Sequence, residues 1–378
     1  MPGSLDGSPG DSMTHLERTT SARLHAALDW IQQAQRATND EGISKGYHLL
    51  RRAWAPSYPE TTGYTIPTLL NAAERLGRTD LHSQSLSLAN YLLNCMTTEG
   101  GVIHWQAKAS SQPIVFDTGQ VVFGLLAAYD FSGKQIYLEA AQRAGNWLCA
   151  IQNEAGYWER NQHLDRVKVI DARVAWALLE LHQRTGVEPY REAAVRNLDW
   201  ACIQQNDHGW FNNCAFQENQ DPLTHTLAYT AEGLLECGIC LGEGRYIASA
   251  QKMLEALLRK QRKDGALAST YRSDWQESSR SSCLTGNCQI ALLWLTLYER
   301  SGEQRFHAAA HKAINFVASR QNLQTKNPNI RGGIPGSAPV YGHYERFKLP
   351  NWAAKFYIDS LIALDKIQGQ PASAHFVG

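Results

Sequence analysis

The chain has 378 residues, of which 43% are hydrophobic and 19% charged, so it can bury a large core and has the composition of a globular protein. Basic and acidic residues both number 36, and the formal net charge is zero without any basic block, which argues against nucleic acid or an anionic membrane as a partner. No apolar run reaches transmembrane length, so we expect no membrane insertion.

The N-terminal segment lacks the apolar core that a signal peptide needs. We therefore expect residues 1–16 to form a flexible leader, residues 17–378 to form one domain, and the protein to be cytoplasmic. The chain contains eight cysteines, which without an export signal are expected to be reduced and mostly buried.

Helical periodicity begins near residue 17 and places Leu24, Leu28, Trp30 and Ile31 on one stripe. A long irregular segment follows, and then two helices joined by a short turn. The same alternation of a long loop and a helix pair continues to the end of the chain. The further predicted helices span residues 61–76, 81–96, 118–131, 134–151, 172–185, 187–204, 226–241, 243–259, 285–301, 303–319 and 351 to about 367, which makes twelve in all.

One short pattern recurs six times along the chain. An apolar helix ends in a glutamine, a polar turn with glycine follows, and an aromatic residue comes next, most clearly in residues 147–158 and 198–210. A period in this range marks a repeat architecture rather than a set of independent domains. The equivalent positions are 61, 56, 53, 56 and 60 residues apart, at Gln35, Met96, Gln152, Gln205, Gln261 and Gln321.

The helices fall into two classes. Those that follow the long loops are apolar almost all round, which indicates burial, whereas those that precede them keep polar residues on one face. Short turns make neighbouring helices antiparallel. We therefore predict an all-α protein, a closed (α/α)6 toroid of six helical hairpins with six inner and six outer helices.

This alternation places all six long loops at one end of the toroid, where the inner helices begin. Helix N-termini carry unpaired N–H groups and a partial positive charge, so a bowl at this end suits an anionic or polyhydroxylated ligand. The opposite end has turns of two or three residues, which we expect to be too short to build a pocket.

The repeat also carries a resemblance. The element Gln152-x-x-x-Gly156-x-Trp158 is similar to the QW repeat of squalene-cyclase and prenyltransferase toroids, and the hairpins with long polar loops resemble the six-hairpin glycosidases, polysaccharide lyases and sugar epimerases. The Asp-x-Asp-Asp and Asp-Asp-x-x-Asp signatures of terpene cyclases do not occur. The resemblance therefore implies a carbohydrate-active enzyme rather than a terpene cyclase or prenyltransferase.

The starts of the inner helices supply the candidate catalytic groups. Glu60, Asp117 and Asp171 are candidates for the general acid and for the base or nucleophile of glycoside hydrolysis, although Asp117 and Asp171 also suit helix N-caps. Elimination or epimerisation of a uronate would instead use a base such as His225 or His343, and a tyrosine such as Tyr64 or Tyr344.

Candidate substrate-binding residues are aromatic, amide or cationic side chains on the long loops and helix starts. They are Trp54, Tyr58, Trp105, Arg173, Asn213, Trp275, Asn287, His343, Tyr344, Arg346, Asn351 and Lys355. Lys355 has an alternative role, an ion pair with Asp359 one turn on. Trp158 and Trp210 are expected to pack into the hairpin turns and so to have a structural role.

Metal signals are weak. The pair Cys237 and Cys240 has no second cysteine pair, and Gly332-Gly333 lacks the Walker spacing, so we expect neither a metal nor a cofactor. The predicted function is a glycoside hydrolase-like enzyme acting on an oligo- or polysaccharide that contains uronic acid. The alternatives are a polysaccharide lyase, a uronate C5-epimerase or a non-catalytic glycan-binding protein. A ligand is expected to contact the helix starts together, at Glu60, Asp117, Asp171, His225, Asn287 and Asn351.

Overall fold

The computed structural model describes residues 15–104 and 112–368. The predicted leader lies outside these residues except for His15 and Leu16, with which the first helix begins. The described ranges contain twelve α-helices: α1 His15–Arg36, α2 Pro59–Leu76, α3 Asp80–Asn94, α4 Val115–Ser132, α5 Gln135–Ile151, α6 Ala172–Thr185, α7 Glu188–Ile203, α8 Thr224–Leu241, α9 Gly244–Lys260, α10 Leu284–Ser301, α11 Gln304–Ala318 and α12 Asn351–Gln368.

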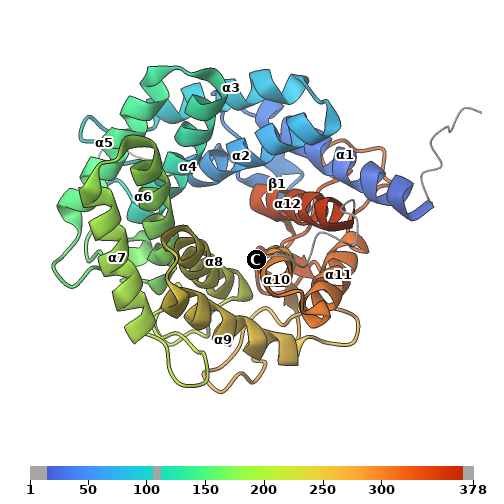
Figure 1. Cartoon of the computed structure of the whole chain (residues 1–378). Coiled ribbons are helices and arrows are strands. Elements are labelled where there is room, and N and C mark those ends of the chain that lie inside the picture. Colours follow the sequence, from blue (N-terminus) through green and yellow to red (C-terminus); the bar gives the residue numbers. More distant parts are fainter. Residues whose placement is uncertain (1–14, 105–111, 369–378) are drawn as a thin grey trace, which may run out of the picture.

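The helices form two concentric rings (Figure 1). The even-numbered helices α2 to α12 make the inner ring and the odd-numbered helices α1 to α11 the outer one, and α12 packs against α1 to close the toroid. The predicted (α/α)6 toroid is therefore confirmed. None of the described helices is both long and apolar enough to cross a membrane.

Short turns join each inner helix from α2 to α10 to the outer helix that follows it. These inner helices end on a glycine in the left-handed conformation, as at Gly77 (φ 64°) and Gly133 (φ 68°). A glycine adopts this conformation without a steric cost, so it can end the helix and reverse the chain within a few residues. The alternation predicted from the sequence thus has a simple local origin.

The recurring glutamines join neighbouring repeats. Nε2 of Gln152 donates to the carbonyl of Gly156 in its own turn, at 3.0 Å, and to the carbonyl of Ala193 on α7, at 2.9 Å. The side chains of Gln205, Gln261 and Gln321 make the same two kinds of bond. The repeat therefore joins four outer helices, α5, α7, α9 and α11, each to the next outer helix around the ring.

Short strands and 3-10 turns shape the long loops. The strands are β1 Gly46–His48, β2 Ala53–Trp54, β3 Ser282–Cys283, β4 Ser337–Ala338 and β5 Lys348–Pro350, and the 3-10 turns are η1 His163–Asp165 and η2 Val169–Asp171. β1 lies between β2 and β5, antiparallel to both, so the loop before α2 is joined to the loop before α12. β3 pairs with β4.

The inner helices α2 and α4 approach each other unusually closely. A Cβ atom on Gly63 would lie 2.6 Å from the carbonyl oxygen of Gln120, and one on Gly124 would lie 2.5 Å from the carbonyl oxygen of Gly63. Glycine at these positions allows the backbones to touch. The first turns of the two helices, which carry Glu60 and Asp117, are thereby brought together.

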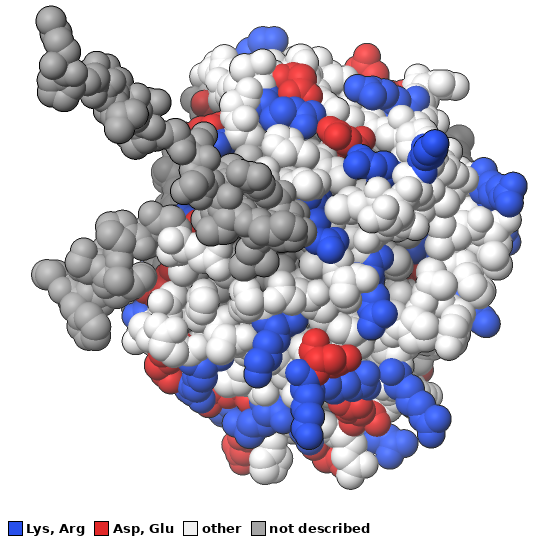
Figure 2. Space-filling model, turned by 90° about the vertical axis from the view of Figure 1, so that its right-hand side faces the viewer, with Lys and Arg blue, Asp and Glu red and all other residues white. Residues whose placement is uncertain are grey.

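Charge on the outer surface is mixed. On the face shown in Figure 2, basic and acidic side chains are interspersed over the described residues. Elsewhere on the surface, charged side chains form ion pairs between neighbouring helices, such as the pair of Arg184 with Asp130, at 2.6 Å. This distribution agrees with a net charge of zero.

Candidate active site

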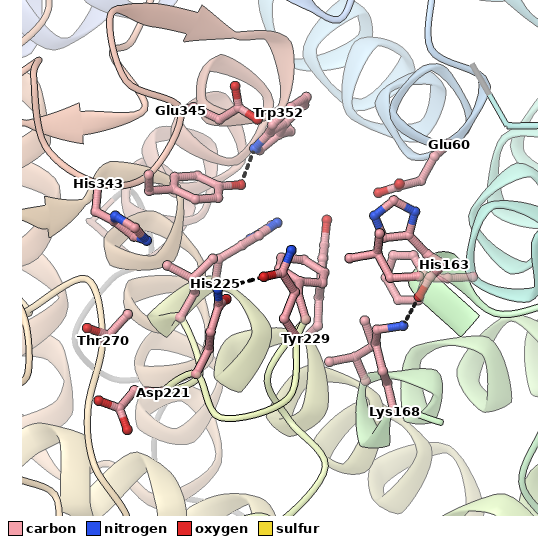
Figure 3. A pocket seen from close by; sticks show the side chains of 18 of the residues that line it. Glu60, His163, Lys168, Asp221, His225, Tyr229, Thr270, His343, Glu345 and Trp352 are labelled. Carbon is pink, nitrogen blue, oxygen red and sulfur yellow. Dashed lines mark hydrogen bonds between the residues drawn. The ribbon is translucent and has the colours of Figure 1, made fainter. Parts of the chain in front are cut away.

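The long loops and the starts of the inner helices enclose a cavity of about 870 Å³. Figure 3 shows Glu60 and His163 on one side of it, Asp221 and Thr270 on the opposite side, and His225 and Tyr229 between them. The titratable groups on its wall are Glu60, Asp117, Asp221 and Glu345, the cations Lys45, Lys168 and Arg280, and the imidazoles of His104, His163, His225 and His343. Among the described residues, six aromatic side chains also line it: Tyr58, Phe116, Phe216, Tyr229, Tyr344 and Trp352.

Glu60 is the second residue of α2. Pro59 suits the first helical position because its ring fixes φ, and Tyr58 precedes it in an extended conformation. The Tyr58 hydroxyl donates a hydrogen bond to Oε2 of Glu60. Burial, and then the neighbouring charge of Asp117, raise the pKa of Glu60 to about 8, against the opposing effects of Tyr58 and Lys45. Glu60 therefore holds its proton at neutral pH.

Asp117 lies in the first turn of α4 and is 1% exposed. Its Oδ2 lies 2.7 Å from Nδ1 of His104. The His104 ring stands edge-on to Tyr58 at 5.2 Å between centroids and lies 5.1 Å from the ring of His163. Glu60, Tyr58, Asp117 and the two histidines thus form one connected group on the same side of the cavity.

Two histidines on the wall are neutral at neutral pH. Burial lowers the pKa of His163 to about 4, and the nearby His104 acts in the same direction. Burial also lowers the pKa of His225 to about 4, against the hydrogen bond that its ring makes with the side-chain oxygen of Gln289. Nδ1 of His225 lies 2.6 Å from Oε1 of Gln289, and the ring lies 4.4 Å from that of Tyr229. Neutral imidazoles can act as bases.

Asp171 lies one layer behind the wall. Its Oδ2 accepts a 2.6 Å hydrogen bond from Nε2 of Gln162, which itself lines the cavity, while its Oδ1 is buried without a hydrogen-bond partner among the described residues. Burial raises the pKa of Asp171 to about 7, and Lys168 opposes this. Nζ of Lys168 donates to the carbonyls of His163 and, at 2.9 Å, of Arg166.

The described residues contain no cluster of three or more His, Cys, Asp or Glu side chains that would hold a metal ion. All eight cysteines are free, and burial raises the pKa of several of them, for example that of Cys214 to about 11. The carboxyl, imidazole and phenol groups of the cavity wall can each transfer protons.

A family model for the beta-L-arabinofuranosidase GH127 catalytic domain matches residues 13–236, which is more than half of the chain. The chain belongs to this family. It is a carbohydrate-active enzyme of the glycoside hydrolase type, which confirms the sugar-active prediction over the terpene-cyclase alternative. The matched residues include Glu60, Asp117, Asp171 and His225. A comparison with curated protein sequences gave no match.

Solved structures of other enzymes share the fold. An unsaturated glucuronyl hydrolase specific for heparin is 13% identical, with a TM-score of 0.75 over 94% of this chain and 99% of that chain. A cellobiose 2-epimerase from Bacillus thermoamylovorans is 13% identical, with a TM-score of 0.72 over 92% and 99%. A sugar epimerase from a ruminal bacterium is 14% identical, with a TM-score of 0.72 over 94% and 100%. At such identity these matches establish the toroid fold.

Six residues that the sequence analysis selected in this glycosidase lie on the cavity wall: Glu60, Asp117, His225, Tyr58, His343 and Tyr344. The Tyr344 hydroxyl accepts a 2.7 Å hydrogen bond from Nε1 of Trp352, which holds both rings in place. Trp105 lies outside the described residues. Of the six helix-start residues expected to meet a ligand together, half line the cavity, namely Glu60, Asp117 and His225.

Three amides selected as binding residues hold backbone or loops instead of lining the cavity. Nδ2 of Asn287 donates to the carbonyl of Cys283, at 2.7 Å. Nδ2 of Asn351 donates to the carbonyl of Ser44, at 2.9 Å. Asn213 adopts a positive φ of 56°, and its amide bonds with the side chain of Gln204. The side-chain N–H groups of these amides point at the protein because helix starts and tight loops contain polar groups that need a hydrogen-bond partner.

Trp54, Trp275 and Arg346 also lie away from the wall. Nε1 of Trp275 donates to the carbonyl of His208, at 2.9 Å, and its ring stands edge-on to Trp210, at 5.2 Å. The ring of Trp54 packs against those of Trp30 and Tyr47, at 5.4 and 5.2 Å. Arg346 is exposed over the ring of Phe347. Each indole gains more contact by packing on another ring than by facing solvent.

A second cavity, of about 560 Å³, lies at the short-turn end of the toroid. This finding corrects the prediction that no pocket can form there. The turns are indeed short, but the inner helices themselves line the space, from Pro67 and Thr68 on α2 to Asp359 and Ile362 on α12. Closing six helices into a ring leaves room along the axis, whatever the length of the turns.

Tyr64, Arg173 and Lys355 face this second cavity, and not the one for which the sequence analysis selected them. Tyr64 and Lys355 lie about one turn inside their helices, which places them below the floor of the first cavity. Nζ of Lys355 lies 2.7 Å from Oδ2 of Asp359, the ion pair foreseen as its alternative role.

The floor between the two cavities is built around Arg173. Its guanidinium is ion-paired with Glu232, and its Nε donates to Oε1 of Gln120, at 2.6 Å. The same group lies 5.1 Å from the ring centroid of Tyr229, on the first cavity, and 5.6 Å from that of Tyr64, on the second. The Tyr229 hydroxyl donates to that of Tyr64, at 3.3 Å.

The sequence analysis did not select Lys45, Lys168, Tyr229 or Glu345, all of which line the first cavity. Lys45 and Lys168 lie inside long loops, where no periodicity in the sequence indicates which way a side chain points. Tyr229 could have been found, because it follows His225 by four residues on an inner helix and so lies on the same face.

Proposed function

We propose that this chain hydrolyses a glycosidic bond of a uronate-containing oligosaccharide, with Glu60 as general acid and Asp117 as its partner. The observation that carries the proposal is the juxtaposition of two carboxyl groups in different environments on one cavity wall. Glu60 retains a proton through burial and the proximity of Asp117, whereas Asp117 is held by an imidazole. Glycosidases assign acid and base roles to paired carboxyls by such differences.

In the proposed reaction, Glu60 gives its proton to the glycosidic oxygen as the bond from that oxygen to C1 breaks. Asp117 either deprotonates the water that adds to C1 or attacks C1 itself and is released by water. The products are two saccharides with one new reducing end. Inverted configuration at C1 would indicate the first route and retained configuration the second.

An acidic substrate is supported by the cations of the wall. Lys45, Lys168 and Arg280 come from three different loops and face one cavity. A fold neighbour, an unsaturated glucuronyl hydrolase specific for heparin, has the same architecture. Cationic side chains in a cleft raise the local concentration of an anionic ligand.

Asp171 is proposed as a supporting carboxyl. It lies behind Gln162, and its pKa of about 7 lets it exchange a proton near neutral pH. We expect its replacement by asparagine to lower activity less than replacement of either wall carboxyl, because it does not line the cavity.

The test compares Glu60→Gln, Asp117→Asn and Asp171→Asn with the wild type on a panel of uronate oligosaccharides. Glu345→Gln is the matched control, because Glu345 lines the same wall but is ion-paired with Lys348, at 2.7 Å. General acid–base groups contribute about 10²- to 10⁴-fold, so E60Q and D117N should each lose about 10³-fold in kcat. Wild-type turnover in both variants would reject the assignment.

A second candidate reaction is epimerisation, favoured by the four imidazoles on the wall, two of them neutral. His225 or His343 would remove the proton beside a carbonyl or carboxylate, and a group on the opposite face would return one. The reaction products distinguish the three reactions. New reducing ends indicate hydrolysis, and ultraviolet absorbance of a C4–C5 double bond indicates a lyase. Deuterium taken up from D₂O at a carbon of inverted configuration indicates an epimerase.

A further inference from the structure

The wall of the short-turn cavity carries one more acid than cation. Among the described residues, its acids are Asp130, Glu180, Glu232, Glu236, Glu299 and Asp359, and its cations are Arg75, Arg173, Arg184, Lys355 and Lys366. Six carboxyl groups less five cations leave one negative charge when all of them are ionised. The inner helices α2 to α10 also end in the short turns here, and helix C-termini carry a partial negative charge. This end of the toroid therefore favours a cation.

Each of the five cations already has an acidic partner. The ion pairs are Arg75 with Asp365, Arg173 with Glu232, Arg184 with Asp130 and Glu180, Lys355 with Asp359, and Lys366 with Glu299. These pairs also account for five of the six acids on the wall. The acid left over is Glu236, whose side chain makes no hydrogen bond or ion pair within residues 15–104 and 112–368.

Glu236 lies on α8, one turn beyond Glu232 and nearer to the end of the helix. Burial, and then the charge of Glu180, raise the pKa of Glu236 to about 7, and Glu299 acts in the same direction, against Arg173 and Arg300. The carboxyl group is thus about half ionised at neutral pH, and a cation that reached it would favour the ionised form. An unpaired carboxyl in such surroundings costs stability, as groups that serve binding often do.

Much of the remaining wall is apolar. The indole of Trp176 packs on the ring of Phe123, at 4.6 Å between centroids. Aliphatic side chains complete this part of the wall, namely Leu126, Leu292, Leu293 and Ile362. A volume of about 560 Å³ leaves room for a ligand with a hydrocarbon body. A metal ion would find too few ligands, because the described residues contain no group of three or more His, Cys, Asp or Glu side chains that could hold one.

We propose that the short-turn cavity binds an organic ammonium ion, which donates its N–H groups to Glu236 and lays its hydrocarbon body against α4, α10 and α12. A primary amine satisfies both parts of the wall, because it supplies the charge that the acid lacks and removes apolar surface from water. The site is separate from that of the proposed hydrolysis, since the floor around Arg173 and Tyr64 lies between the two cavities.

Calorimetric titration of the full chain at pH 8 tests this with 2-phenylethylammonium chloride and with 2-phenylethanol, in which a hydroxyl replaces the ammonium group. We expect the wild type to bind the cation about tenfold or more tightly than the alcohol, because the bond to the carboxylate is charge-assisted. Glu236→Gln should remove most of this preference and change the affinity for the alcohol by less than about twofold.

The pH dependence of binding provides a second measurement on the same variant. Because the ionised form of Glu236 binds the cation and its pKa is about 7, the affinity of the wild type should rise by about tenfold between pH 6 and pH 8. The affinity of E236Q for the cation should be nearly constant over this range. An equal rise in both proteins would assign the titration to another group and overturn the inference.

Two further variants locate the site. Glu299→Gln is the matched control in the same cavity, because its carboxyl already pairs with Lys366, and it should keep the preference for the cation within about threefold. Glu60→Gln is the control for the long-loop cavity and should bind the cation as the wild type does. A loss in E60Q equal to that in E236Q would overturn the inference. Equal affinity of the wild type for cation and alcohol, or no binding of the cation at about 10 mM, would also overturn it.

Discussion

The two cavities lie at opposite ends of one ring of inner helices, yet their carboxyl groups have different partners. In the long-loop cavity, Glu60 is bonded to a tyrosine and Asp117 to a histidine. In the short-turn cavity, most carboxyls are ion-paired, as Asp359 is with Lys355 and Glu232 with Arg173. A carboxyl that pairs with a phenol or imidazole can exchange protons with a substrate, whereas one paired with a cation is fixed in charge. We therefore expect proton transfer at the long-loop end and a stabilising role for the carboxyls at the short-turn end.

The largest expected effect on stability concerns Arg173, which joins the two ends. Its side chain is 2% exposed, and Arg173→Met would leave Glu232 and the amide of Gln120 without their partner. Breaking a buried ion pair from one side costs about 3–5 kcal/mol, because the remaining charge stays desolvated. Urea unfolding at pH 7 would measure this loss.

The control for Arg173 is Lys366→Met at the rim of the same cavity. Lys366 pairs with Glu299, but its side chain is 54% exposed, so water screens the interaction and we expect a change of about 0.5 kcal/mol or less. Similar midpoints for the two variants would show that the floor of the toroid does not depend on the buried guanidinium, and would weaken the structural role assigned to the short-turn end.

The next effect, about tenfold, concerns the pH dependence of activity. Glu60 must carry its proton to act as an acid, and its pKa is about 8, so kcat/KM should fall by about tenfold between pH 7 and pH 9. The fall occurs on the alkaline side because the protonated form is the active one. A profile from pH 5 to pH 10 checks this.

A substitution at Glu236 is the control for this pH profile of activity. Its pKa is also raised, to about 7, but it lines the short-turn cavity. Glu236→Gln should therefore leave the alkaline limb of the profile where it is. A shift of this limb in E236Q, or its absence in the wild type, would contradict the division of roles between the two ends.

The features of the two ends that can be predicted from the sequence are those that a local sequence pattern encodes. Helical periodicity, glycine at the end of each inner helix and the recurring glutamines define the toroid, because each acts locally or between adjacent repeats. Glu60, Asp117 and His225 could be found because the first turns of α2, α4 and α8 face the same cavity. These inferences need no knowledge of side-chain packing.

The remaining site residues depend on information that a pattern does not contain. A tryptophan in a loop can face a ligand or another ring, and Trp275 packs on Trp210. Tyr64 and Lys355 lie one turn deeper than the helix starts, and that difference moves them to the other cavity. Lys45 lies in a loop whose course is set by pairing between β1 and β5, residues that are about three hundred positions apart. Long-range pairing of this kind leaves no local signal.

The last expected effect tests the short-turn end by itself. Burial, with Glu180 next, raises the pKa of Glu236 from 4.5 to about 7, against Arg173 and Arg300. Between these two pH values the native state holds a proton that the unfolded chain has lost, so the stability contributed by protonated Glu236 decreases as pH rises from about 4.5 to 7. Glutamine has no charge to desolvate. E236Q should therefore be more stable than the wild type at pH 8, by about 1–3 kcal/mol, and nearly equal to it at pH 4.5.

Guanidinium unfolding at both pH values measures the difference in stability. The control is Glu299→Gln, which removes a carboxyl already paired with Lys366 and should show no such gain at pH 8. An equal difference between E236Q and the wild type at the two pH values would mean that the carboxyl is as well solvated in the folded protein as in the unfolded chain. Water would then reach Glu236 in the short-turn cavity, and burial could not be the reason for its raised pKa.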